Sequence, residues 1–132
     1  GTIERFAQEL GILFQIKDDE LGLFADEKKI GKPVGSDIIE NKKTIYQVLL
    51  FEKASSEEKN KLDKIFGNES ISESDVQYVR ELLTQLGVID EVNKHLDELK
   101  LSIDDKIEIL PTSQINKELL HEFVQYNLNR GK

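Results

Sequence analysis

The sequence predicts an all-α protein, a helical bundle with short connections, and three observations support that prediction. Apolar residues recur at spacings of three and four along most of the 132 residues. No stretch shows the regular alternation of apolar and polar residues that is typical of a half-buried strand. Residues that end helices, such as Gly67, Gly87 and Pro111, stand between the periodic segments. The length suits one domain or part of one, and we see no internal repeat.

The first helix is predicted over residues 2–22, because Thr2 is a suitable N-cap and Gly22 a suitable residue near the end. A loop is expected over residues 23–41, where Gly31, Pro33 and Gly35 interrupt the helical period. The apolar side of the helix should face the core, and it consists of Ile3, Phe6, Leu10, Leu13, and Ile16 or Leu21.

Two helices are predicted in the middle of the chain before the first long amphipathic segment. One spans about 42–53, and a shorter one runs from Ser55 or Ser56, with Glu58 as the partner of a capping box, to Phe66. The inward residues of the first should be Ile45, Val48 and Leu49, with Phe51 as a further candidate.

Three amphipathic helices are predicted in the remainder of the chain. They span Ser72 to Leu86, Ile89 to about Leu110, and about Ser113 to Leu128. The expected core residues of the three helices are Val76, Val79, Leu82, Leu83 and Leu86; Ile89, Val92, Leu96, Leu99 and Ile103; and Leu119, Leu120, Phe123 and Val124.

Charge and composition exclude several classes of function. The formal net charge of −8 argues against nucleic acid or an anionic membrane surface as the main partner. The absence of cysteine excludes disulfides, thiolate metal sites and cysteine nucleophiles. No apolar run approaches the roughly 20 residues needed to span a bilayer, and no signal peptide is visible. We therefore expect a cytoplasmic, helix-rich protein.

An acidic pair on the first helix is the strongest candidate for chemistry. Gln15, Asp18, Asp19 and Gly22 stand at i, i+3, i+4 and i+7, so they share one face of the helix. Neighbouring carboxylates repel each other unless a cation lies between them. Mg²⁺ prefers oxygen ligands, often takes one or two carboxylates, and completes its shell with water and phosphate oxygens.

Glycines and lysines follow the acidic pair at Gly31, Lys32, Gly35 and Lys42. Lysine ammonium groups would supply the positive charge that a diphosphate needs. Together the two features predict a metal–diphosphate site. The alternative is a solvated acidic face, which is common in a chain with 26 acidic residues.

Three runs in fixed order resemble the second aspartate-rich region of trans-type isoprenyl diphosphate synthases. They are Phe14-Gln15-x-x-Asp18-Asp19, then Gly31-Lys32-Pro33-x-Gly35-Ser36-Asp37, then Glu40-x-Lys42-Lys43-Thr44. The form is most similar to archaeal-type geranylgeranyl diphosphate synthases. The family motif is commonly Asp-Asp-x-x-Asp, and its third acidic position is Gly22 here, an absence that the archaeal-type enzymes share.

The resemblance implies roles for single residues. Asp18 and Asp19 would be catalytic residues that bind Mg²⁺, and Lys32 would be catalytic and hold the allylic diphosphate. Lys42 would also bind diphosphate, while Phe14 and Gln15 would line the cavity near the reacting carbons. Gly31, Gly35 and Asp37 would shape the loop, with Asp37 orienting Lys32 or a metal-bound water. Arg130 and Lys132 resemble a basic tail, although a solvated terminus is the simpler interpretation.

The resemblance also implies partners and domain organisation. The substrates would be an allylic diphosphate and isopentenyl diphosphate. Residues 1–132 would form the C-terminal portion of a polyprenyl synthetase domain whose N-terminal half is absent, so this chain alone would lack activity. We expect a homodimer or pairing with that half. The alternative function is a non-catalytic helical partner subunit of a prenyl synthase.

Other polar residues are weaker candidates for a site. His95 and His121 are 26 positions apart with no acidic partner at ligand spacing, which argues against a zinc site. Asp104 and Asp105 repeat the acidic pair, but no glycine–lysine loop follows them. We expect them on a helix surface or in a turn.

Overall fold

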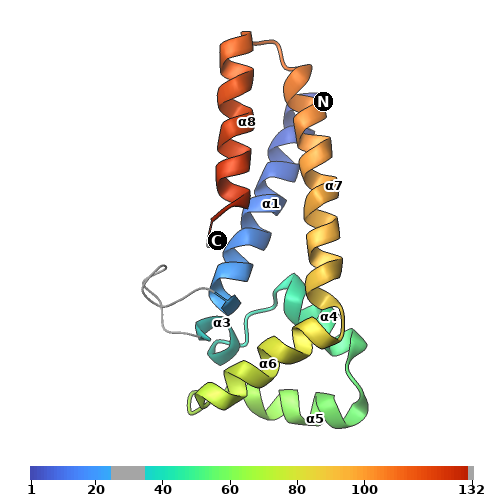
Figure 1. Cartoon of the computed structure of the whole chain (residues 1–132), viewed down its shortest axis with the longest axis vertical. Helices are drawn as coiled ribbons and strands as arrows, with labels where there is room; N and C mark the ends of the chain where they lie inside the picture. Colours follow the sequence, from blue (N-terminus) through green and yellow to red (C-terminus); the bar gives the residue numbers. More distant parts are fainter. Residues whose placement is uncertain (25–34, 131–132) are drawn as a thin grey trace. The chain divides into compact units, whose positions relative to one another are not determined.

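The computed structural model describes residues 1–24 and 35–130, and in that part of the chain every regular element is a helix (Figure 1). The helices are α1 (Thr2–Phe24), α3 (Ser36–Ile39), α4 (Ile45–Lys53), α5 (Ser56–Ile65), α6 (Glu73–Gln85), α7 (Val88–Glu108) and α8 (Gln114–Leu128). This confirms the all-α prediction. The chain divides into two compact units, one of Gly1–Lys17 with Asn93–Lys132 and one of Asp18–Val92.

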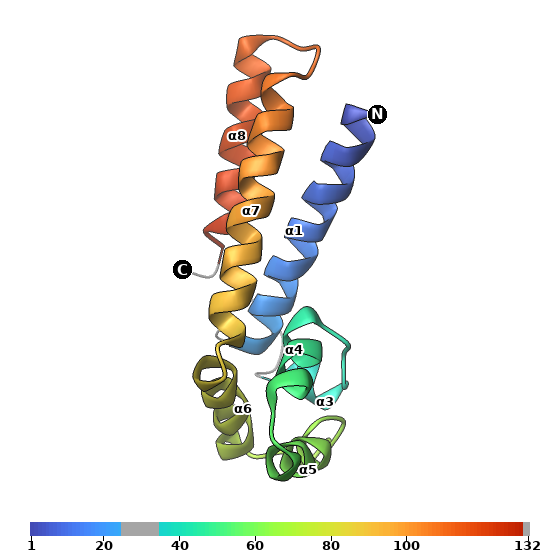
Figure 2. The ribbon, with the colours of Figure 1, turned by 90° about the vertical axis from the view of Figure 1, so that its right-hand side faces the viewer.

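The first unit combines the start of α1 with most of α7 and with α8. Helices α7 and α8 run side by side in both views (Figures 1 and 2). Leu13 of α1, Ile103 and Ile107 of α7 and Val124 of α8 are almost completely buried. An ion pair between Glu9 and Lys106 also links α1 to α7.

The second unit holds α3, α4, α5 and α6 together with the last turns of α1. Leu23, Ile38, Leu50, Leu62 and Val79 form much of its core, and each is at most 3% exposed. The Nε of Arg80 on α6 donates a hydrogen bond of 2.7 Å to the carbonyl oxygen of Leu23. This bond satisfies one of the carbonyl groups that the end of α1 leaves without an intrahelical partner.

Helix starts agree in part with the predicted cap residues, since the cap at Ser55 is present, whereas Thr2, predicted as an N-cap, is the first residue of α1. Ser55 and Glu58 form a complete capping box at the start of α5, and Ser72 forms another with Asp75 at the start of α6. Helix α4 begins at Ile45, later than predicted, because the Thr44 hydroxyl accepts the N–H of Gln47 and makes Thr44 the cap. Helix α1 continues past Gly22 to Phe24.

Removing the α5 cap should lower stability by a measurable amount. We expect Ser55→Ala to cost about 1 kcal/mol, because the N–H of Glu58 loses its acceptor. The melting temperature should then fall by a few degrees, measured by circular dichroism. Ser56→Ala is the matched control, since Ser56 is the first helical residue and does not cap. Equal melting temperatures for the two variants would contradict the assigned cap.

Two predicted buried faces are wrong in part. In α4 the buried residues are Tyr46, Gln47 and Leu50, whereas Val48 is 50% exposed. The physical reason is the packing of Tyr46. Its ring lies edge-on against Phe24 with the centroids 6.1 Å apart, so the face of α4 that carries Tyr46 is the buried one. In α8 only Val124 of the four predicted residues is buried, and Leu119 and Phe123 are 57% and 48% exposed.

The core faces of α6 and α7 agree more closely with the prediction. Val76, Val79, Leu82 and Leu83 are buried in α6, while Leu86 at its end is only partly buried. Of the five residues predicted for α7, the four from Val92 to Ile103 are buried, while Ile89 is only partly buried. On α1, Leu13 and Ile16 are buried, but Ile3 is 61% exposed. No helix in the described part of the chain has the length and apolar character required to cross a membrane.

Candidate functional site

The acidic pair lies in the last turns of α1 and its two members differ in environment. Asp18 is exposed, whereas Asp19 is only 4% exposed. An ionised carboxylate is costly to bury without a charged or hydrogen-bonding partner. Lys42 supplies one, because its Nζ lies 3.2 Å from Oδ1 of Asp19. The structure thus joins the acidic helix to the lysine predicted from the third sequence run.

Lys42 is held between α3 and α4. Its backbone N–H donates to the carbonyl oxygen of Asp37 at 3.0 Å. The hydrogen bond to Asp19 raises the pKa of the Lys42 ammonium against the opposing effect of burial, and the charges of Asp19, Asp37 and Asp18 raise it further. The side chain keeps 38% of its surface exposed. Lys42 is therefore a charged group at neutral pH that remains accessible to solvent.

Asp37 on the short helix α3 is buried at 3% exposure next to Gly22. A Cβ atom at residue 22 would lie 2.1 Å from Oδ2 of Asp37, far inside van der Waals contact. The turn into α3 depends on Gly35, whose φ of 78° is in the left-handed region. A Cβ there would approach Val76 to 2.9 Å. Both glycines thus shape the surroundings of Asp37.

The donor set at the end of α1 fits a magnesium ion. Asp18 and Asp19 offer carboxylate oxygens, and one or two carboxylates are what Mg²⁺ commonly takes from a protein when phosphate and water complete its shell. Across the ranges 1–24 and 35–130, no group of three or more His, Cys, Asp or Glu residues is arranged to hold a metal by itself.

The remaining predicted site residues are placed as follows. Lys32 and Gly31 fall within residues 25–34 and Lys132 within 131–132, so all three lie outside the described residues. Phe14 and Gln15 belong to the first unit. Gln15 is exposed, and the Phe14 ring packs edge-on against Phe123 of α8 with the centroids 5.5 Å apart. Arg130 follows α8 and is partly buried.

Tyr46 is a residue near this site that sequence reasoning missed. It is 2% exposed, and burial, followed by the charges of Glu20 and Asp19, raises the pKa of its phenol. Its hydroxyl therefore stays protonated across the physiological range. In the sequence Tyr46 stands two residues after Thr44, and the amphipathic pattern of α4 did not distinguish it from its neighbours.

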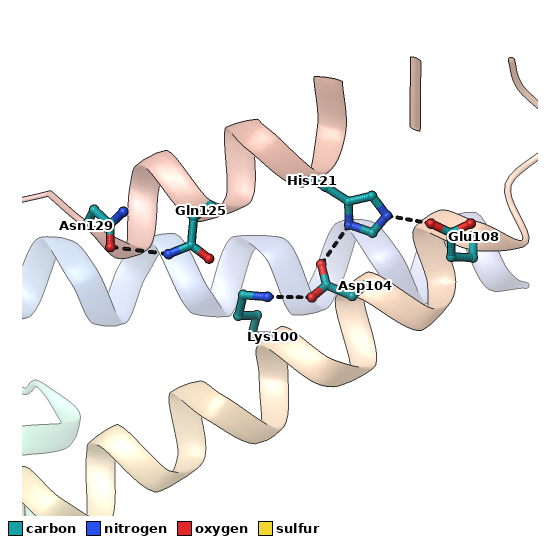
Figure 3. Close-up of polar contacts among 6 residues, drawn as sticks. All are labelled: Lys100, Asp104, Glu108, His121, Gln125 and Asn129. Atoms are coloured by element: carbon teal, nitrogen blue, oxygen red, sulfur yellow. Dashed lines mark hydrogen bonds and ion pairs between the residues drawn. The ribbon is translucent and has the colours of Figure 1, made fainter. Parts of the chain in front are cut away.

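A second polar cluster surrounds His121 in the first unit, and it gives this histidine two acidic partners that the sequence spacing does not indicate. Figure 3 shows the ring between two carboxylates of α7. Nδ1 is 2.9 Å from Oδ1 of Asp104, and Nε2 is 2.7 Å from Oε1 of Glu108. Lys100 also contacts Asp104, with Nζ 2.6 Å from Oδ2. Asp104 therefore lies on a helix surface, as predicted, with two partners.

These contacts require a protonated imidazole. A neutral ring has one N–H, whereas both ring nitrogens here face an acceptor. The hydrogen bond to Glu108 and the one to Asp104 raise the pKa of His121 against the effect of burial. Burial raises the pKa of Asp104, but the hydrogen bonds from Lys100 and His121 together outweigh it, and the pKa of Asp104 is lowered.

The stability of the α7–α8 pair should therefore depend on pH. Because the folded pKa of His121 is above its unfolded value of about 6.5, its contribution is complete below pH 6.5 and is lost as pH rises through the folded pKa. The lowered pKa of Asp104 gives a contribution that is lost in acid. Since both groups are partly exposed, we expect a change of about 0.5–1 kcal/mol, or a few degrees in melting temperature.

Thermal unfolding at pH 6 and at pH 9 measures this effect. The chain should melt at a lower temperature at pH 9, and His121→Gln should remove most of the difference. His95→Gln is the control, because His95 is exposed on α7. If the His121→Gln variant keeps the full pH dependence, the two ion pairs of His121 do not contribute to stability.

Comparisons with known proteins agree with one another. The sequence model of the polyprenyl synthetase family matches residues 1–83. A geranylgeranyl diphosphate synthase of Sulfolobus acidocaldarius is 35% identical over 127 residues, which are 96% of this chain and 38% of that protein. The crystal structure of geranylgeranyl pyrophosphate synthetase from Pyrococcus horikoshii Ot3 superposes with a TM-score of 0.84 at 36% identity, covering 98% of this chain and 38% of that one.

A third similar protein is a geranylgeranyl pyrophosphate synthase from Corynebacterium glutamicum, crystallised with isoprenyl diphosphate and magnesium. Its TM-score is 0.86 at 26% identity, over 95% of this chain and 36% of that one. The chain thus spans well under half of the length of each of these relatives.

Proposed function

Since the chain belongs to the polyprenyl synthetase family, we propose that it carries the metal- and diphosphate-binding part of a short-chain trans-prenyltransferase. The reaction would condense isopentenyl diphosphate with an allylic diphosphate and yield geranylgeranyl or farnesyl diphosphate. The bond between the allylic carbon and oxygen breaks, diphosphate leaves with the electron pair, and the double bond of isopentenyl diphosphate attacks the allylic carbon. Transfer of a proton to the released diphosphate would complete the product.

The observation that carries this proposal is the ion pair between Asp19 and Lys42. It joins the acidic pair of α1 to a lysine 23 positions later. A diphosphate that binds together with a metal ion requires carboxylates for the metal and positive charge for the phosphates in the same site. Asp19 also keeps the Lys42 ammonium in place while the side chain remains partly accessible. A solvated acidic face would need neither the burial of Asp19 nor this partner.

Asp18 and Asp19 would hold Mg²⁺, Asp18 as the exposed ligand and Asp19 from its buried position. When bound, the ion would stabilise negative charge on the departing diphosphate. Lys42, and Lys32 by its place in the motif, would add ammonium charge at the same oxygens. The Corynebacterium glutamicum protein, which was crystallised with isoprenyl diphosphate and magnesium, supports this assignment.

Phe14 and Gln15 would line the path of the hydrocarbon chain. The edge-on contact of the Phe14 ring with Phe123 supports this role, because it gives Phe14 an apolar neighbour in the first unit. An apolar wall would also exclude water, which would otherwise quench the allylic cation. The catalytic residues would thus be Asp18, Asp19 and Lys32.

We also propose that residues 1–132 form the C-terminal portion of the enzyme and act together with an N-terminal half, in a homodimer or a two-part assembly. The coverage of the relatives supports a part of a longer enzyme, since the matched region is 38% of the Sulfolobus protein. Exposed apolar residues on α8 also support it, because Ile115, Leu119 and Tyr126 are each more than half exposed.

A chimera tests the proposed function. This chain would replace the matching 127 residues of the Sulfolobus acidocaldarius synthase, and prenyl transfer would be followed with labelled isopentenyl diphosphate and geranyl or farnesyl diphosphate. We expect magnesium-dependent transfer by the chimera and none by the chain alone. A folded chimera that transfers no label, compared with the active parent synthase, would favour a non-catalytic partner subunit.

A further inference from the structure

Helix α8 is attached to the first unit through few buried apolar side chains. Of its 15 residues only Val124 and Asn127 are buried, and the apolar side chains of Ile115 and Tyr126 are 71% and 70% exposed. Burial of an apolar face is the usual source of stability for a helix in a folded protein. Since α8 buries so little, its polar contacts with α7 contribute a large share of its attachment.

These polar contacts converge on His121 (Figure 3). Its two ring nitrogens face the carboxylates of Asp104 and Glu108, which are one turn apart on α7. Lys100 contacts the other carboxylate oxygen of Asp104, and Lys117 of α8 donates to the carbonyl oxygen of Glu108 at 2.6 Å. Both ring contacts exist together only while the imidazole is protonated, because a neutral ring has one N–H. Loss of that proton leaves a carboxylate without its donor and removes the positive charge between two negative ones.

The attachment of α1 to α7 uses charges of a different kind. Glu9 of α1 forms an ion pair with Lys106 of α7, which also donates to the hydroxyl of Ser102 at 2.7 Å. Histidine is the side chain that normally changes its charge between pH 5 and 8, whereas carboxylates and ammonium groups keep theirs. Deprotonation of His121 therefore weakens the attachment of α8 to α7 and leaves the contact between α1 and α7 unchanged. On α8 itself, Glu118 is exposed one turn before His121.

The contacts that α8 makes with the rest of the unit directly follow His121 in the chain. Phe123 packs edge-on against Phe14 of α1 with the ring centroids 5.5 Å apart, and Val124 is the buried apolar residue of the helix. Asn127 donates to the carbonyl oxygen of Phe123 at 2.9 Å. Movement of α8 away from α7 at His121 would thus also separate Phe123 from Phe14.

We propose that His121 is a pH-sensitive latch, which holds α8 closed over Phe14 while its ring is protonated and lets α8 open when the ring loses its proton. The latch is closed in mildly acidic solution and opens as pH rises. In the proposed function Phe14 lines the hydrocarbon path, so the closed latch would complete one side of that path. That consequence rests on the proposed function, whereas the latch itself does not.

Labelling of a single introduced cysteine measures the opening of α8, because the chain has no cysteine of its own. Val124→Cys places a thiol at a position that is 1% exposed, which a thiol reagent reaches when α8 opens. Ile115→Cys, at a position that is 71% exposed, gives the reference rate at each pH and corrects for ionisation of the thiol. We expect the rate at residue 124, divided by this reference, to rise about threefold from pH 6 to pH 9.

Two further variants test whether the charge of residue 121 causes this rise. His121→Arg stays charged at both pH values and should keep the ratio low at both. His121→Gln is neutral and should give the higher ratio at both. A rise from pH 6 to pH 9 that persists in His121→Arg, or a ratio that does not change with pH in the unmodified background, would overturn the latch.

A second buried cysteine distinguishes opening of α8 from unfolding of the whole chain. Ile65→Cys lies in α5 of the second unit at a position that is 4% exposed. Val124→Cys should react faster than Ile65→Cys by about tenfold or more, because local opening requires less free energy than global unfolding. Equal rates would mean that α8 does not open separately, and the proposal would be wrong. The labelling requires no prenyl transfer, so an inactive chimera would refute the proposed function without changing this result.

Discussion

Replacement of Asp18 by alanine should reduce the rate of prenyl transfer by the chimera at least about 100-fold. Asp18 is exposed beside the Asp19–Lys42 pair, and in our proposal it is a direct ligand of Mg²⁺. Metal ions supply several kcal/mol of charge stabilisation in the transition state, and each 1.36 kcal/mol is a factor of ten in rate. The measurement is steady-state transfer of label at saturating magnesium.

The matched control is Asp105→Ala. Asp105 is also an exposed member of an adjacent acidic pair on a helix, but no glycine–lysine loop follows it. Its replacement should leave the rate of transfer within about twofold, a difference of roughly 0.4 kcal/mol. Equal losses in the two variants would mean that net charge, and not a ligand at Asp18, determines the activity.

Replacement of Leu50 by alanine should be strongly destabilising. Leu50 is completely buried in α4, and removal of such a side chain costs about 2–5 kcal/mol from lost burial and the cavity that remains. The melting temperature of the chain should fall by about 10 °C. Val48→Ala on the same helix is the control, because Val48 is 50% exposed and its truncation should cost about 0.5 kcal/mol or less.

These two variants also decide which face of α4 is buried. The sequence favoured Val48 as an inward residue, whereas the structure buries Tyr46, Gln47 and Leu50. A larger fall in melting temperature for Val48→Ala than for Leu50→Ala would support Val48 as the inward residue of α4.

Much of the fold was predictable because the signals are local. Cap residues such as Ser55 and Ser72 mark helix starts by hydrogen bonds that span three residues. The long amphipathic patterns of α6 and α7 are similarly local, and their buried faces agree with prediction except at the ends. In α4 and α8 apolar residues occur on more than one face, so the sequence pattern does not determine which face is buried. Tertiary packing determines it.

In the candidate site too, some contacts follow from the sequence motif and others do not. The pairing of Asp19 with Lys42 is consistent with the motif, since both residues belong to the runs that predicted a metal–diphosphate site. The contact of Gly22 with Asp37 joins two elements separated by a loop, and no spacing rule within one helix could reveal it. The acidic partners of His121 were missed for the same reason, because they stand on the preceding helix, α7.

A calorimetric titration of the chimera with inorganic pyrophosphate, with and without Mg²⁺, shows whether the end of α1 binds a metal ion together with a diphosphate. Binding should require magnesium, should be abolished by Asp18→Ala and should be preserved by Asp105→Ala. Pyrophosphate binding that is indifferent to magnesium, or that survives Asp18→Ala unchanged, would contradict a metal–diphosphate site at the end of α1.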